Sequence, residues 1–100
     1  MSNEQYDFVW GLWFDMLEGL APGLPEYLDE HLRDDGEDDY IRLARIPAGA
    51  TDAKGRSLDE DVWVLDHYVM GQMFFASRSE AESAFRDSVE RDVWDPSRGL

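Results

Sequence analysis

The C-terminal third of the chain carries the most regular hydrophobic pattern. Apolar and small residues recur at helical spacing between Ala81 and Trp94, separated by charged positions. Ser77 and Glu80 stand three residues apart, the spacing of a capping box, and Pro96 follows where a helix must end. The pattern therefore predicts an amphipathic helix over residues 77–94.

The segment before this helix, residues 62–75, is rich in β-branched and aromatic residues. This composition favours strands, with a turn or bulge at Gly71. Apolar residues also recur at helical spacing over 58–76, and Ser57 begins a second capping-box spacing, so a helix is the alternative. We expect the C-terminal helix to pack on a sheet formed here. The expected contact joins Phe85 and Val89 of the helix to the sheet that contains Val62 and Val64.

Residues 2–21 are mostly apolar, with a narrow polar stripe at helical period. The stripe consists of Asp7, Gly11, Asp15 and Glu18. A helix this widely apolar must be buried on several sides or must meet a partner. Apolar residues also alternate perfectly over residues 6–16, so a strand is the alternative for this segment.

Pro25 and Glu26 suit the first turn of a second helix, which Gly36 would end. Its apolar face would consist of Tyr27, Leu28, His31 and Leu32. Residues 40–46 then alternate as a strand, and residues 47–58 read as a mobile loop. The expected fold is thus one α+β domain over residues 1–100. It would have two N-terminal helices, a short antiparallel sheet of two to three strands and a C-terminal amphipathic helix.

Charge adds a second pattern, because acidic residues are unevenly distributed. The chain has a net charge of −14, and residues 26–39 hold eight acids against one base, or −7. Repulsion from phosphate opposes direct binding to nucleic acid or to an anionic membrane, whereas a basic protein surface would be attracted. The acids that we expect to bind a partner are Glu26, Asp29, Glu30, Asp34, Asp35, Glu37, Asp38 and Asp39.

The overall composition indicates a folded protein of the cytoplasm. Hydrophobic residues make up 43% of the chain, more than an acidic disordered tail would contain. There is no cysteine, which fits a reducing compartment. The N-terminus lacks the basic start of a signal peptide, and the longest apolar run, residues 8–14, is too short to span a bilayer.

Residue spacings typical of catalysis, metal binding or cofactor binding are missing from the sequence. A calcium loop built around Gly36 would need oxygen ligands where His31 and Arg33 stand. His31 and His67 have no metal-ligand spacing, and His67 in a strand is expected to be a hydrogen-bonded, partly buried residue. No phosphate-binding glycine loop or nucleophile motif occurs. We expect no metal, no cofactor and no enzymatic activity.

Trp10 and Trp13 lie three residues apart on the N-terminal helix, whose apolar surface exceeds the area of one core contact. Tryptophan is enriched among the residues that dominate binding energy at protein interfaces. Both tryptophans are therefore candidate partner-binding residues. The partner would be either another protein or a second copy, which would form a homodimer through the N-terminal helix.

Small size, clustered acid and the lack of motifs favour an interaction protein. It would inhibit a larger protein by occupying its basic, nucleic-acid-binding surface. In these features the chain is similar in type to phage-encoded inhibitors of host defence, including anti-CRISPR proteins that mimic nucleic acid, although it matches no family motif. One alternative is a salt-adapted cytosolic domain, which eight Arg and one Lys against 23 acids would suit. Another is an immunity-type protein that caps a nuclease.

Overall fold

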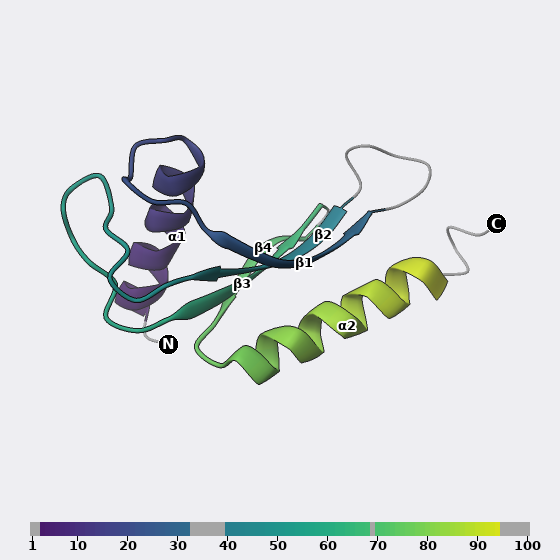
Figure 1. Cartoon of the computed structure of the whole chain (residues 1–100). Helices are drawn as coiled ribbons and strands as arrows, with labels where there is room; N and C mark the ends of the chain where they lie inside the picture. The colour runs from purple at the N-terminus through teal and green to yellow at the C-terminus, as the bar shows by residue number, and fades with distance from the viewer. Residues whose placement is uncertain (1–2, 33–39, 69, 95–100) are drawn as a thin grey trace.

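The computed structural model describes residues 3–32, 40–68 and 70–94, which form two helices and one four-stranded antiparallel sheet (Figure 1). The chain is thus an α+β protein. The elements in chain order are α1 (Asn3–Leu17), β1 (Glu26–Leu32), β2 (Tyr40–Ile46), β3 (Val62–His67), β4 (Gly71–Phe75) and α2 (Arg78–Trp94). Neither α1 nor α2 is long and apolar enough to cross a bilayer.

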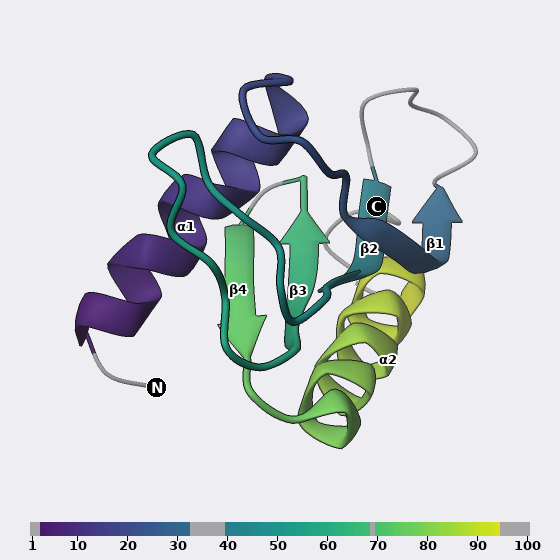
Figure 2. The ribbon, with the colours of Figure 1, turned by 60° about the vertical axis from the view of Figure 1, so that its left-hand side comes forward.

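The sheet is a meander in which each strand pairs with the next one along the chain. Its order is β1-β2-β3-β4, so β1 and β4 are the two edges, as Figure 2 shows. Successive side chains of a strand point to opposite faces. On β3, Val64 belongs to the core beneath α1, whereas the next residue, Leu65, belongs to the core beneath α2. The two helices therefore cover opposite faces of one sheet.

The core beneath α1 is the larger of the two. Val9, Leu12, Trp13 and Met16 of the helix are all buried in it, because they recur at the spacing of one helical face. They meet the sheet through alternate residues of its strands. The sheet residues in this core are Ala44, Ile46, Val62 and Val64, with Phe74 partly buried against them.

The core beneath α2 contains Phe85, as expected, and Val89 is packed against it. Its sheet residues are Ile41, Leu43 and Leu65. The helix thus packs on the sheet that contains Val62 and Val64, but on the face opposite to those two valines. Both faces of β3 carry apolar residues. The sequence pattern therefore did not show which face α2 would cover.

The prediction of an N-terminal helix is confirmed by α1, and the alternative of a strand over residues 6–16 is wrong. The helix ends in a Schellman arrangement, in which the Leu20 N–H donates to the Asp15 carbonyl at 2.8 Å and the Gly19 N–H to the Met16 carbonyl at 3.4 Å. Gly19 has a φ of 77°, which glycine adopts without strain. The helix therefore ends several residues before Pro22.

The second helix expected over residues 25–36 is wrong, because residues 26–32 form the edge strand β1. A bulge at Leu28 explains the misleading pattern, since the register shifts between Tyr27 and Asp29. The extra residue places Leu28 on the α2 face, together with His31 three positions later. A bulged strand thus reproduces an apolar spacing that is typical of a helix.

Strand β1 is also held by arginines that lie far away in the sequence. Glu26 and Glu30 stand opposite Arg45 and Arg42 of β2 and form ion pairs with them. Opposite charges directly across two strands stabilise the pairing. A prediction based on local spacing does not include such partners, so it favoured the helix.

The C-terminal helix is confirmed by α2, and the Glu80 N–H donates to the Ser77 Oγ at 3.4 Å, as the capping-box spacing predicted. Residues 62–75 form two strands, β3 and β4, so the helical alternative for 58–76 is wrong. Gly71 follows the turn and has a φ of 80°. With β2 confirmed over residues 40–46 and β1 added, the sheet has four strands rather than two to three.

Candidate functional site

The acidic residues predicted to bind a partner begin on the exposed edge strand β1. Glu26, Asp29 and Glu30 are all exposed, and β2 is the only strand with which β1 pairs in the described part of the chain. An edge strand also presents backbone N–H and C=O groups on its outer side. The structure therefore places these three carboxylates along one accessible border of the sheet.

Two of the three carboxylates are already neutralised within the sheet. The Arg42 Nε donates to the Glu30 Oε2 at 2.6 Å, and the Arg45 guanidinium donates to the Glu26 carboxylate. The Arg45 Nη1 also lies 3.6 Å from the Asp61 Oδ2. Glu26 and Glu30 therefore hold β1 against β2, in addition to any contact with a partner.

Aromatic rings surround the Arg42 guanidinium on the α1 face of the sheet. The Arg42 Cζ lies 4.2 Å from the centre of the Tyr40 ring and 5.7 Å from that of Tyr27. Burial alone would lower the pKa of Arg42, but the hydrogen bond to Glu30 raises it above its usual value. Burial also raises the pKa of the Tyr27 hydroxyl, which the nearby Arg42 charge only partly offsets. The Arg42 side chain is thus held in place by one carboxylate and two aromatic rings.

Asp29 lies on the opposite face of β1, beside α2. Its Oδ1 accepts a hydrogen bond from the Glu30 N–H at 2.8 Å. Together with Leu28 it lines a groove of about 460 Å³ between β1 and α2, which Arg78 and Arg86 of the helix also line. This groove joins one predicted acid to basic residues that the sequence did not single out, since they are brought near only by the packing of α2.

The remaining predicted acids lie outside the described residues. They are Asp34, Asp35, Glu37, Asp38 and Asp39, which follow β1 in the chain and precede β2. These five acids are therefore next to an exposed edge strand in the sequence.

The two candidate tryptophans of α1 have different environments. Trp13 is completely buried in the core beneath α1, so its side chain is not at the surface. Trp10 is 40% exposed and belongs to an aromatic cluster with Tyr6, Phe14 and Phe74. Tyr6 and Trp10 stack with ring centres 6.4 Å apart, and both pack edge-on against Phe74 of β4.

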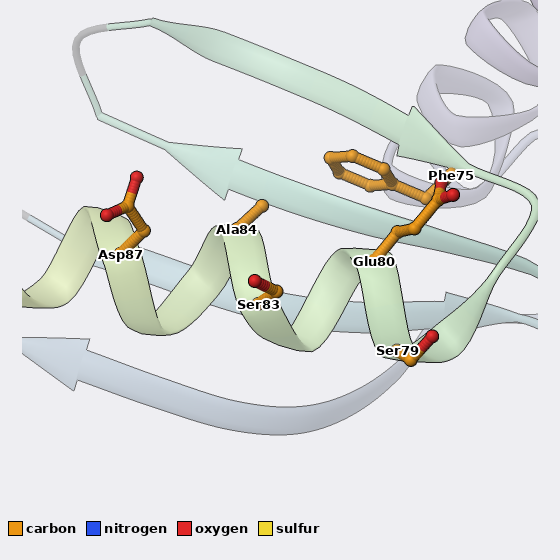
Figure 3. A pocket seen from close by; sticks show the side chains of 6 residues that line it. All are labelled: Phe75, Ser79, Glu80, Ser83, Ala84 and Asp87. Carbon is orange, nitrogen blue, oxygen red and sulfur yellow. The ribbon is translucent and has the colours of Figure 1, made fainter.

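A second groove, of about 540 Å³, lies on the other side of α2 (Figure 3). Phe75 at the end of β4 forms its apolar wall, and α2 contributes Glu80, Ser83 and Asp87. With Ser79 also in the lining, the groove therefore offers two carboxylates and two hydroxyls over an apolar base. In the described part of the chain, no three residues of the types His, Cys, Asp and Glu gather in an arrangement that would bind a metal ion.

Asp52 is a buried carboxylate that the sequence analysis did not identify. It accepts hydrogen bonds from the Lys54 N–H at 3.0 Å, the Arg56 N–H at 2.8 Å and the Arg56 Nε at 3.0 Å. Burial acts to raise the pKa of Asp52, but these hydrogen bonds outweigh it and hold the pKa below its usual value. Asp52 therefore organises the turn formed by residues 52–56.

Asp66 and His67 at the end of β3 are buried polar residues on opposite faces of the strand. The Gln72 Nε2 donates to the Asp66 Oδ1 at 2.9 Å, and the Met70 N–H donates to the His67 Nδ1 at 3.2 Å. The His67 ring also stacks on Tyr68, with centres 4.9 Å apart. His67 is thus a hydrogen-bonded, buried residue of the β3–β4 hairpin, as the sequence predicted.

Comparison with known proteins adds no family to these observations. No family model matches the chain, and neither the curated proteins nor the solved structures gave a significant match.

Proposed function

We propose that the protein is a small acidic inhibitor that occupies the basic, nucleic-acid-binding surface of a larger protein. One observation carries the proposal. The acidic segment of the sequence begins on β1, an exposed edge strand with carboxylates on both of its faces. The proposed activity is of the type found in phage anti-defence and anti-CRISPR proteins that mimic nucleic acid.

The number and placement of acids support a basic partner. Residues 26–39 carry −7, half of the net charge of −14. Three of these acids lie on the exposed edge strand β1, and the other five follow it in the sequence. Carboxylates on and after β1 would stand where phosphates stand, and their field would speed the encounter with a positive cleft.

The acids of β1 have different roles, because two of the three form ion pairs with β2. Because Arg45 and Arg42 neutralise Glu26 and Glu30, those two acids fix the position of the strand. Asp29, with the acids that follow β1 in the sequence, would supply the charge that attracts the partner. Trp10 is exposed beside Phe74 of β4, at the edge opposite to these acids, and Trp13 is buried in the core.

A salt-adapted domain is the second candidate, and the spread of the other acids favours it. Exposed acids also occur at Glu4 and Asp7 of α1, at Asp59 and Glu60, and along α2. In that case the charge keeps the protein hydrated and has no partner. An immunity-type protein that caps a nuclease would use the same acidic surface as the inhibitor.

The proposal describes binding without catalysis, without a cofactor and without direct contact to nucleic acid or membrane. A cytoplasmic location is part of it, and the absence of cysteine supports a reducing compartment.

The decisive experiment compares two variants of equal charge. One replaces Asp34, Asp35, Asp38 and Asp39 with Asn. The matched control replaces Glu4, Asp7, Asp59 and Glu60 with Gln or Asn, which removes the same charge from exposed positions elsewhere. Each protein competes with labelled duplex DNA for a panel of purified DNA-binding proteins with basic clefts, and stopped-flow kinetics give the association rate.

We expect the wild type and the control to displace DNA, and the first variant to associate about tenfold more slowly in low salt. This difference should shrink as the salt concentration rises, because exposed charges are then screened. Equal rates for both variants would contradict the proposal, and so would a panel from which no DNA is displaced. A gel shift of DNA by the protein alone at 0.1 M salt would contradict the charge argument itself.

A further inference from the structure

The two edges of the sheet differ in their protection against further strand pairing. β1 carries three exposed acids and a bulge, which are devices that keep an edge from pairing with another strand. β4, the opposite edge, consists of Gly71, Gln72, Met73, Phe74 and Phe75 and has no ionisable side chain. It pairs with β3 in five consecutive registers without a bulge. Among the described residues, no strand pairs with its outer side.

Exposed aromatic rings lie directly beside this unprotected edge. Tyr6 and Trp10 of α1 are each 40% exposed, and their ring centres lie 5.5 Å and 6.0 Å from that of Phe74. β4 and these two rings therefore form one uncharged strip, and Glu80 and Asp87 of α2 line the groove beside its Phe75 end. We call this strip the β4 surface, defined by Tyr6, Trp10 and residues 71–75.

We propose that a second copy of the chain binds the β4 surface, by antiparallel pairing of β4 with β4 across a two-fold axis. Such an interface is isologous, so each surface must be complementary to itself. An axis through Met73 places Gly71 opposite Phe75 of the other copy and Gln72 opposite Phe74. The smallest residue of the strand then faces a large one, and no charge faces a like charge.

The distribution of charge favours self-association at β4 over self-association at the acidic parts of the surface. Two copies at −14 each repel one another, and acids are exposed on β1, α1 and α2. The β4 edge brings two copies together without an acid in the strand ladder. Because the repulsion between the rest of the two molecules is screened by salt, the dimer should strengthen as salt rises. Binding to a basic partner should weaken under the same change, so the two interactions can be separated.

Sedimentation equilibrium of the purified protein at 0.05 M and 0.5 M salt tests this inference. We expect a dimer whose dissociation constant falls at the higher salt concentration. Trp10→Glu places a charge on the β4 surface and should raise the dissociation constant at least tenfold. Tyr27→Glu is the matched control, because Tyr27 is an exposed aromatic residue of the other edge and the change in charge is the same. Circular dichroism establishes that both variants remain folded.

The absence of cysteine in the chain allows a direct test of the register. Met73→Cys would put two thiols opposite each other at the two-fold axis, within the range that a disulfide spans. Mild oxidation should crosslink this variant to a covalent dimer, whereas Asp29→Cys on the β1 edge should stay largely monomeric. A wild type that is monomeric at both salt concentrations would overturn the inference. So would a Trp10→Glu dimer as tight as wild type, or equal crosslinking of the two cysteine variants.

Discussion

At the scale of single residues, the turn around Asp52 shows how one carboxylate orders an otherwise irregular segment. Its two oxygens accept three hydrogen bonds within the 47–61 segment, and the Ala53 N–H next to it donates to the Asp15 Oδ2 of α1 at 3.1 Å. The turn thus connects the segment to the helix that it covers. A sequence with 23 acids gives no sign that this one is buried, because two of its three donors are backbone N–H groups that any residue carries.

The lowered pKa of Asp52 makes its contribution to stability depend on pH. A carboxyl with a lower pKa in the folded state stabilises the fold above its unfolded pKa of about 3.9. That contribution is lost as pH falls through the folded pKa. Asp52→Asn should therefore lower the melting temperature at pH 7, and its difference from wild type should shrink below about pH 4. Thermal melts from pH 7 to pH 3 measure this, with the exposed Asp59→Asn as control. A difference that stays constant over this range would contradict the prediction.

The two tryptophans of α1 show a limit of sequence reasoning at this scale. Trp10 and Trp13 lie on one apolar helix, and both were candidates for contact with a partner. Only the path of α1 across the sheet decides that Trp13 is buried while Trp10 is exposed. Sequence spacing predicts that two residues are near one another on a helix, but not how wide the covered part of the helix is.

At the scale of elements, prediction succeeded where the stabilising contacts are local. The capping box and apolar period of α2, the alternation of β2 and the glycine that begins β4 all act within a few residues. β1 was mistaken for a helix because its bulge and its two ion pairs depend on β2. The sequence pattern thus placed Glu26, Asp29 and Glu30 in a helix, whereas they lie on the strand β1.

The packing of α2 on the sheet can be tested by truncating Phe85. Phe85 is 7% exposed and packs with Ile41, Leu43 and Leu65. Truncation of a buried Phe leaves a cavity, so Phe85→Ala should lower the free energy of unfolding by about 3–5 kcal/mol. Leu24→Ala is the control, because Leu24 is 74% exposed and should change stability by no more than about 0.5 kcal/mol. Urea denaturation of both variants provides the values, and equal stability of Phe85→Ala and wild type would contradict this packing.

At the scale of the whole molecule, a charge of −14 on 11.5 kDa raises the question of low-salt stability. Screening is weak at 0.01 M salt, where the Debye length is about 30 Å. We expect the protein to remain folded there, because arginines offset acids on both sheet and helix. The ion pairs are Arg42–Glu30 and Arg45–Glu26 in the sheet, and Arg78–Glu82 and Arg91–Asp87 on α2.

Circular dichroism at 0.01 M and 1 M salt measures this directly. Similar spectra and cooperative melts at both concentrations agree with acids that serve a partner. A protein that folds only in 1 M salt would contradict the inhibitor proposal and favour the salt-adapted domain.

The meander order of the sheet also has a consequence for folding kinetics. Because every strand pairs with its neighbour in the chain, each hairpin can form as soon as its second strand has been synthesised. α1 is the exception. It precedes all four strands in the chain, yet Tyr6 and Trp10 contact the sheet through Phe74 of β4, the last of those strands. The apolar side of α1 is therefore completely covered only after β4 has been synthesised.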